Sequence, residues 1–352
     1  MIDPYMAVAL QTSVHHVTKR DEVKKNLTHI GNMIDLAVHM CSIELPVRLI
    51  ALSEGVIQGF VDEIMGMDQP SYAKTMAADI PGWETDMLGE KAQQHGVYII
   101  AQLKSKMPEF PDRFFNTVFI IDPQGEVIHQ QRKNVLLFVE HCTTPHDVYD
   151  EWVALYGDSL ESFFPVAKTE IGNIGGTVGV EGAFPESYRA FAMNGAEILY
   201  RGALPEPWVS REIYQVQNRA RAMDNTCYML APNGGSLIMP GPDGQSTVVD
   251  GGLGGRSSIV SYNGDVLASS TESGNGYIAA EINIEALRNY RETAHIQNWI
   301  PFLRTELYSK LYEKSIWPKN QPPMDQAGTN KLFRKILDDL YERGVYTKKS
   351  KN

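Results

Sequence analysis

Short apolar segments alternate with helical segments along most of this chain, which restricts it to folds that mix strands and helices. Five segments have the length and composition of buried strands: residues 6–11, 47–52, 98–103, 198–201 and 228–231. Residues 21–38 carry apolar side chains with a helical period of about 3.6 residues, and residues 84–95 form a second helical segment. The alternation runs without a linker, so we expect one large domain.

Tight turns join several neighbouring strands of this chain in place of helices. Residues 122–125, Asp-Pro-Gln-Gly, separate two apolar segments, and Asn263-Gly264 is a favoured hairpin turn between two more. A third hairpin is predicted around Gly172-Asn173, with strands at residues 166–169 and 174–180. Because strands joined by hairpins run antiparallel, the sequence predicts an α/β fold with mixed sheets and helices on the outside.

The composition favours an ordinary globular protein. The chain has 352 residues, of which 43% are hydrophobic, and this is ample for a large core. Its formal net charge of −11 argues against nonspecific binding to nucleic acid. No apolar stretch approaches the roughly 20 residues that cross a bilayer, and the first residues lack the basic and apolar regions of a signal peptide. We therefore expect a cytoplasmic protein that binds neither nucleic acid nor membrane.

The three cysteines, Cys41, Cys142 and Cys227, are odd in number and far apart in the sequence. This pattern indicates neither a disulfide framework nor a CxxC metal site. His141, Cys142 and His146 lie close together, but their spacing fixes no metal-ligand geometry. We expect no metal site and no cofactor.

A sharp turn at Gly179 stands between an apolar strand and a helix that begins near Pro185. Hydrolases often hold a catalytic nucleophile on such an elbow, where it meets the substrate. Gly179 has no side chain and so offers no attacking atom.

This elbow resembles the nucleophile elbow of the nitrilase superfamily of carbon–nitrogen hydrolases, above all that of the aliphatic amidases and formamidases. The family pattern is Cys-x-Asp/Glu-x-x-Phe/Tyr-Pro-Glu, and Glu181 and residues 184–186 match it. Gly179 stands where the family has its catalytic cysteine. The resemblance covers nearly all of residues 5–310, and it implies the family's four-layer α-β-β-α sandwich.

Hydrolysis of an amide through a thioester needs a thiolate, a base that generates it and a positive group that holds the oxyanion. The resemblance implies Glu54 as the base, because Glu54 and Gly59 match the family motif Phe-Pro-Glu-x-x-x-x-Gly after an apolar strand. It implies Lys133 as the oxyanion holder, because residues 131–133 follow a hairpin as the family's Tyr-Arg-Lys motif does. Glu140 lies where the family often has a second glutamate that positions the substrate.

Two interpretations of Gly179 are open. In one, glycine replaces the cysteine by design, to trap an inactive enzyme. In the other, it is a natural departure, which gives either a non-catalytic relative or an enzyme that uses water. Glu54 would then activate the water, while Lys133 and the Val180 amide would stabilise the oxyanion. We expect neither Cys142 nor Cys227 to take over the role of the nucleophile.

Three residues are candidates for substrate binding. Val180 follows the nucleophile position, and Phe60 follows the motif of Glu54. Trp208 lies in a loop that borders the pocket in family members. It could line the pocket or pack in the protein interior, and the sequence favours neither.

The resemblance implies an amidase that hydrolyses a small non-peptide amide to a carboxylic acid and ammonia. Two alternatives keep the fold: a non-catalytic binding or assembly subunit, and a nitrilase acting on nitriles. We divide the chain into a hydrolase domain at residues 1–310 and a C-terminal extension at residues 311–352, which the resemblance implies contacts other subunits. Large apolar residues near the chain end, among them Trp299 and Phe302, also need a cover, so we expect a homo-oligomer, either a dimer or a dimer-based hexamer.

Overall fold

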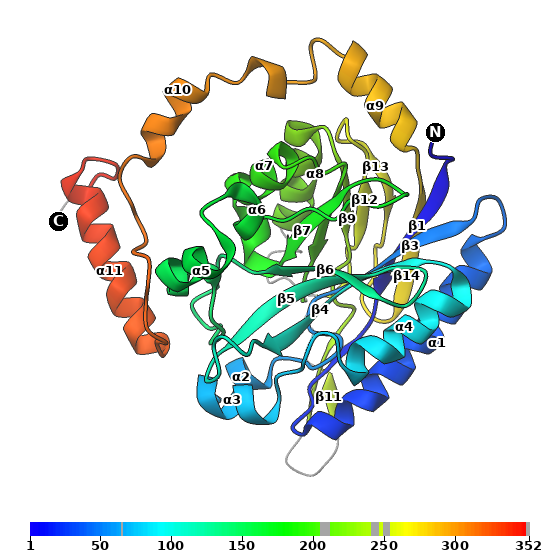
Figure 1. Ribbon diagram of the computed structural model, residues 1–352, viewed down its shortest axis with the longest axis horizontal. Coiled ribbons are helices and arrows are strands. Elements are labelled where there is room, and N and C mark those ends of the chain that lie inside the picture. Colours follow the sequence, from blue (N-terminus) through cyan, green and yellow to red (C-terminus); the bar gives the residue numbers. More distant parts are fainter. Residues whose placement is uncertain (65, 205–211, 241–245, 249–253, 350–352) are drawn as a thin grey trace.

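Two β-sheets pack face to face at the centre of the molecule, and helices cover the outer face of each sheet (Figure 1). The computed structural model describes residues 1–64, 66–204, 212–240, 246–248 and 254–349. The layers follow the order helix, sheet, sheet, helix, so the predicted four-layer α-β-β-α sandwich is confirmed.

Six strands form the first sheet: Tyr5–Gln11 (β1), Val47–Leu52 (β3), Tyr98–Lys106 (β4), Phe114–Ile121 (β5), Val127–Arg132 (β6) and Gly276–Ile282 (β14). Their order across the sheet is β14–β1–β3–β4–β5–β6. Strands β1, β3 and β4 are parallel, whereas the pairs β14–β1, β4–β5 and β5–β6 are antiparallel. The sheet is therefore mixed, as predicted.

Five strands form the second sheet: Ile174–Val178 (β7), Ile198–Gly202 (β8), Tyr228–Ala231 (β9), Ser258–Val260 (β12) and Val266–Ser269 (β13). Strands β7, β8 and β9 are parallel, and β12 and β13 extend the sheet as an antiparallel hairpin beside β9. A smaller sheet consists of Val14–His15 (β2), Leu237–Pro240 (β10) and Ser246–Val248 (β11).

The two large sheets contact each other through side chains that alternate along the strands. In β1, Ala7 and Ala9 belong to the layer between the sheets, whereas Val8 belongs to the core beneath the helices. The small alanines let the sheets approach closely, and larger residues such as Tyr200 of β8 fill the layer. The Tyr200 hydroxyl donates a 2.6 Å hydrogen bond to the carbonyl of Leu52, the last residue of β3, and so joins the two sheets.

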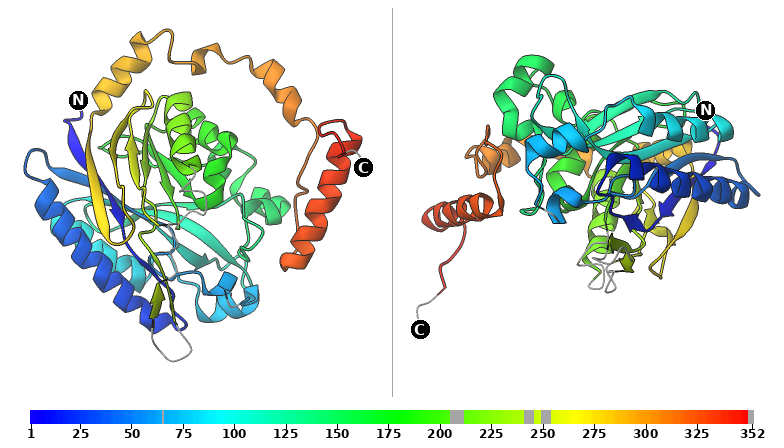
Figure 2. Two further views of the ribbon diagram at one scale, coloured as in Figure 1. Left: turned by 180° about the vertical axis from the view of Figure 1, so that it is seen from behind. Right: turned by 90° about the horizontal axis from the view of Figure 1, so that it is seen from below.

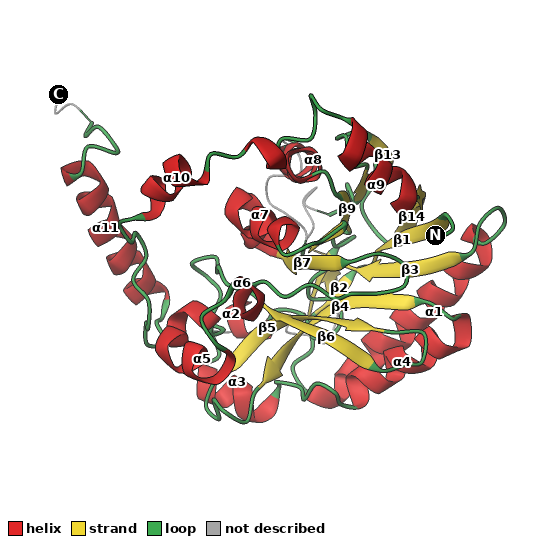
Figure 3. Ribbon diagram, turned by 45° about the horizontal axis from the view of Figure 1, so that its top comes forward, coloured by secondary structure: helices red, strands yellow, loops and turns green. Residues whose placement is uncertain are grey.

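The helices form two outer layers, which Figure 3 shows on opposite sides of the strands. The core against the first sheet contains residues of Val23–Cys41 (α1), Gln69–Thr75 (α3) and Trp83–His95 (α4). The core against the second sheet contains residues of Pro185–Met193 (α7) and Ile213–Asn225 (α8). Three short helices lie in loops: Val61–Ile64 (α2), Tyr149–Tyr156 (α5) and Leu160–Phe163 (α6).

The chain after β14 has a buried part and an exposed part. Ile284–Thr293 (α9) belongs to the core, because Ile284 and Leu287 are fully buried between the sheets and neighbouring elements. Thr305–Tyr308 (α10) and Gln326–Glu342 (α11) then follow the outside of the molecule (Figures 1 and 2). This outer segment exposes large apolar side chains from Ile296 onward. The domain division at residue 310 stays a prediction.

The hairpin that the sequence predicted around residues 172–173 is present only as a single antiparallel bridge, and its predicted strand bounds are wrong. Residues 166–169 are not a strand, and they meet β7 only through an isolated bridge between Ala167 and Ile174. Strand β7 pairs instead with β8 over its full length, and it ends at Val178. Pairing with β8 satisfies the backbone of β7 on that side and places its inward side chains between the sheets.

Candidate active site

The elbow after β7 is built around Gly179. This residue has a φ of 58°, in the left-handed region that glycine adopts without a steric penalty. It opens a 3-10 turn, Gly179–Ala183, and Pro185 then occupies the first turn of α7, where its missing N–H costs nothing. The carbonyl of Gly179 accepts a 3.3 Å hydrogen bond from Nε of the buried Arg201.

Charged side chains from three elements converge on this elbow. Glu54 follows the end of β3, and Lys133 follows the end of β6. Lys133 Nζ lies 3.2 Å from Glu54 Oε1 and 2.8 Å from each carboxylate oxygen of Glu140. An ideal Cβ on Gly179 would lie 2.6 Å from Glu54 Oε2 and 3.0 Å from Lys133 Nζ. The structure therefore brings Glu54, Lys133, Glu140 and Gly179 together.

Glu54 is held by a buried chain of amides that the sequence analysis missed. Asn116 of β5 donates a 2.9 Å hydrogen bond to Glu54 Oε1 and accepts a 2.7 Å bond from Gln102 of β4. Gln102 in turn accepts from the N–H of Gly55 at 2.8 Å. Glu54 Oε2 is buried and has no hydrogen-bond partner in the described part of the chain. One carboxylate oxygen is thus fixed, and the other is free toward residue 179.

Lys133 provides a fixed positive charge. Its burial alone would lower the pKa of the ammonium, but Glu140 and Glu54 outweigh this effect and hold the pKa of Lys133 above its usual value. Burial raises the pKa of Glu140, with Lys133 opposing the change and Glu54 adding to it. A buried ammonium that stays charged at neutral pH is suited to stabilise an oxyanion.

Glu181, two residues after Gly179, connects the elbow to the loop that follows Lys133. Its buried carboxylate accepts hydrogen bonds from the backbone N–H of Asn134 and from Thr177, both at 2.8 Å, and from Ser187 at 3.0 Å. Burial raises the pKa of Glu181. The sequence marked this residue only as part of the elbow motif, and the structure shows how it positions that motif.

A second buried lysine, Lys104 of β4, lies beside the segment that follows Glu54. Lys104 of β4 forms ion pairs with Asp62 and with Glu63, the latter at 3.0 Å. Its ammonium lies 5.1 Å from the centre of the Phe60 ring. Phe60 is a buried member of the core beside Gly55. Its predicted contact with substrate stays a prediction.

The remaining candidates are placed as follows. Val180 is the second residue of the turn that Gly179 opens, and its oxyanion role stays a prediction. Trp208 lies outside the described residues. Cys142 and Cys227 are buried free thiols. Burial raises the pKa of Cys142 well above its usual value and that of Cys227 to about 11, so both stay protonated at neutral pH.

The sequence matches the carbon–nitrogen hydrolase family over residues 7–292. The chain belongs to that family. A deaminated glutathione amidase from Synechocystis is 28% identical over 236 residues, which are 65% of this chain and 77% of the relative. A Bacillus cereus formamidase is 28% identical over 66% of this chain and 63% of its own length. A β-ureidopropionase from Arabidopsis thaliana is 23% identical over 70% of this chain and 59% of its own length.

Solved structures of nitrilase-superfamily members share the fold of this carbon–nitrogen hydrolase. A carbon–nitrogen hydrolase from Helicobacter pylori has a TM-score of 0.65 at 19% identity, over 89% of this chain and 99% of its own. A cysteine-to-alanine mutant of a Nesterenkonia amidase has a TM-score of 0.62 at 17% identity, over 87% and 97%. In another mutant of that amidase, with a TM-score of 0.58 at 16% identity over 87% and 97%, the acetamide moiety of fluoroacetamide is bound covalently to the active-site cysteine.

The described part of this hydrolase offers no group of three or more histidine, cysteine, aspartate or glutamate side chains arranged to hold a metal ion. None of the helices in the same residues combines the length and apolar character that a bilayer crossing requires.

Buried Glu63 should make the stability of the protein depend on pH. Burial raises the pKa of Glu63 to about 8, with Lys104 opposing the shift and Asp62 and Glu140 adding to it. The unfolded chain releases this proton near pH 4.3, so the stability that protonated Glu63 contributes is full below about pH 4 and is lost as the pH rises to about 8. Glu63→Gln keeps the neutral form at every pH. The free energy of unfolding of Glu63→Gln, measured in urea titrations, should therefore rise relative to that of the wild type as the pH increases from 5 to 8.

The exposed Glu126→Gln change serves as the control for the loss of one carboxylate. The difference between its free energy of unfolding and that of the wild type should stay constant over the same pH range. A Glu63→Gln difference that is equally constant would show that Glu63 is ionised throughout.

Proposed function

We propose that this carbon–nitrogen hydrolase is an amidase that converts a small non-peptide amide into a carboxylic acid and ammonia. One observation carries the proposal: Glu54 Oε2 and Lys133 Nζ lie 2.6 Å and 3.0 Å from the ideal Cβ position of residue 179. A base and a positive charge thus flank the place of the nucleophile. The names of the amidase and formamidase relatives support the same chemistry, and the adduct of the Nesterenkonia amidase supports the role of a cysteine there.

The residues of this chain also support a route without a thiol. A water molecule held by Glu54 Oε2 transfers a proton to this oxygen as the water oxygen attacks the amide carbon. Lys133 and the Val180 N–H stabilise the oxyanion of the tetrahedral intermediate. Glu54 then returns the proton to the leaving nitrogen, the C–N bond breaks, and the acid and ammonia form.

A non-catalytic subunit of the same fold is the second candidate. The observation that favours it is Gly179 itself, because the position that bears a cysteine in the family pattern has no side chain here. For either candidate we propose a cytoplasmic location. We also propose a homo-oligomer, since Met193 and Val216 on the outer helices α7 and α8 are 52% and 62% exposed.

Gly179→Cys should create or restore a covalent amidase. The thiol would enter beside Glu54 and Lys133, and the Glu54 carboxylate, at the end of a flexible side chain, would move to admit it. Intact-protein mass spectra with a reactive amide such as fluoroacetamide should show an adduct on the cysteine variant alone. Gly179→Ala is the matched control, because it imposes the same backbone strain without a thiol. Turnover by the Gly179 protein without an adduct supports direct attack by water, whereas no turnover by any of the three proteins supports the non-catalytic subunit.

Glu54→Gln and Lys133→Ala should each lower the activity of the Gly179→Cys form by at least about 100-fold, because they remove the base and the oxyanion charge. Steady-state rates of ammonia release measure the effect, and circular dichroism confirms the fold. The controls are Glu170→Gln and Lys106→Ala, which change one partner of a surface ion pair each. Unchanged rates in Glu54→Gln or Lys133→Ala would exclude these roles.

Light scattering should show a dimer or a dimer-based hexamer for the full chain at micromolar concentration. Truncation after residue 298 should reduce the assembly, because it removes the exposed apolar side chains of Phe302, Leu307 and the residues that follow. This cut retains α9, whose Arg288 forms a 2.7 Å ion pair with Glu197, so the domain keeps its core. A monodisperse monomer of the full chain would contradict the prediction.

A further inference from the structure

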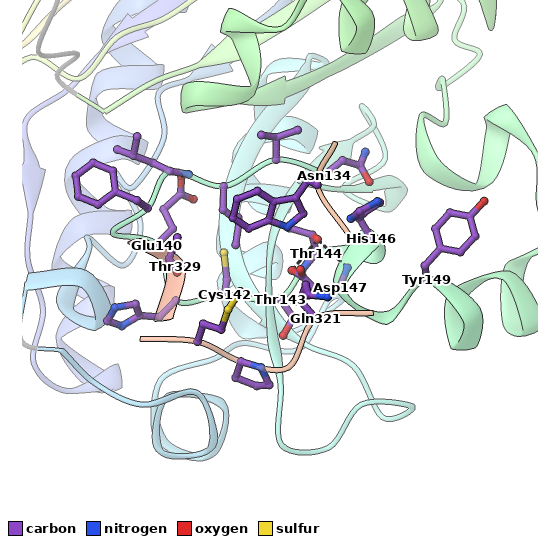
Figure 4. Close-up of a pocket in the computed structure, with 18 of the residues that line it drawn as sticks. Asn134, Glu140, Cys142, Thr143, Thr144, His146, Asp147, Tyr149, Gln321 and Thr329 are labelled. Atoms are coloured by element: carbon purple, nitrogen blue, oxygen red, sulfur yellow. Dashed lines mark hydrogen bonds between the residues drawn. The ribbon is translucent and has the colours of Figure 1, made fainter. Parts of the chain in front are cut away.

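A cavity of about 1160 Å³ lies between the hydrolase domain and the C-terminal extension. Figure 4 shows that residues from both parts of the chain line it: Asn134 and Glu140 from the domain, and Gln321 and Thr329 from the extension. Its apolar lining includes Leu136, Phe163, Phe164, Trp317, Met324 and Phe333. Its volume is above the roughly 300–1,000 Å³ of usual ligand pockets, and it far exceeds the needs of formamide or acetamide.

The cavity reaches the catalytic cluster through Glu140. This carboxylate lines the cavity and also lies 2.8 Å from Lys133 Nζ. Asn134 lines it as well, with its N–H on Glu181 and its Nδ2 on the carbonyl of Phe163. The Oδ1 atom of Asn134 is buried and has no hydrogen-bond partner among the described residues.

The charges of the cavity disfavour an anion. The described residues of the lining include the acidic side chains of Glu140, Asp147 and Asp158 and the guanidinium of Arg113. The histidine at residue 146 adds no positive charge near neutral pH, because burial lowers its pKa. A neutral amide fits such a site better than a carboxylate, which would add a negative charge beside these acidic groups.

Part of the extension is anchored as a wall of this cavity. Lys319 forms a 2.6 Å ion pair with Asp150 of α5, and Asn320 donates a 2.7 Å hydrogen bond to the same carboxylate. The N–H of Asn320 also donates to the carbonyl of His146 at 3.0 Å. These contacts place the segment that carries Trp317 and Met324 against the domain.

We propose that this cavity binds the apolar, aromatic acyl group of the substrate, so that the enzyme acts on primary amides with an arylalkyl chain. The proposal rests on the proposed amidase function and names its substrate class. The aromatic group packs against Phe163, Trp317 and Phe333, while the amide group lies toward Glu140 and Lys133.

Isothermal titration calorimetry of the full chain tests the proposal with 3-phenylpropanamide, acetamide and 3-phenylpropanoate. The phenyl amide should bind at least about tenfold more tightly than acetamide, because its ring leaves water for an apolar wall. It should also bind more tightly than 3-phenylpropanoate, which carries the same ring and a negative charge. Equal affinities of the two amides would overturn the proposal. No binding of the phenyl amide would also overturn it, and this is the result expected if a second subunit fills the cavity.

A matched pair of variants locates the binding. Phe333 and Phe302 are both in the C-terminal part of the chain and are 53% and 55% exposed, but only Phe333 is among the described residues that line the cavity. Phe333→Ala should weaken binding of the phenyl amide about tenfold, and Phe302→Ala should leave it unchanged. Equal effects of the two changes would show that the ring binds elsewhere.

Turnover by the Gly179→Cys form separates this proposal from the proposed function. Binding that depends on Phe333, together with no turnover and no adduct, would keep the cavity as a ligand site and overturn the amidase. Turnover of acetamide without binding of the phenyl amide would keep the amidase and overturn the arylalkyl specificity.

Discussion

The face-to-face packing of the two sheets is the constraint on which the site depends. Glu54 and Gly179 are separated by more than a hundred residues of sequence, yet each follows the carboxyl end of a parallel strand, β3 and β7 respectively. Small side chains between the sheets let these strand ends approach, and the hydrogen bond from Tyr200 to the carbonyl of Leu52 joins the sheets two residues before Glu54. The relative placement of Glu54 and the elbow is thus set by the core, which gives both of them a rigid support.

Buried charge is the second feature that sets this fold apart from a simple sandwich. Two lysines, Lys133 and Lys104, are each 2% exposed or less, and each lies between two carboxylates. Removing such groups from water costs several kcal/mol per ion, and the mutual attraction offsets this cost only with good geometry. An apolar core would stabilise the fold at lower cost. The charges around Lys133 lie beside the elbow at Gly179, whereas those around Lys104 tie the loop after Glu54 to β4.

The sequence predicted the parts of the structure that depend on local pattern. The resemblance to the family motifs indicated Glu54 and Lys133, and a helix was predicted to begin near Pro185, where α7 begins. Gln102 and Asn116 were missed, although polar residues inside apolar strands are a readable sign of a buried network. The hairpin predicted at residues 166–180 is reduced to one bridge. A turn signal such as Gly172-Asn173 shows where the chain reverses, but not how many residues pair on each side of the turn. The cavity was beyond prediction, since its walls come from segments that the chain brings together only in three dimensions.

Gly179 has a consequence for the balance between stability and activity. A residue with a side chain at a φ of 58° is strained by roughly 1–2 kcal/mol, and its Cβ would also press on the Glu54 carboxylate. Glycine removes both penalties at this position. Enzymes commonly sacrifice stability at their active sites to keep a reactive group in place. At residue 179 of this chain neither penalty applies, so the elbow between β7 and α7 is relaxed beside the Glu54 carboxylate.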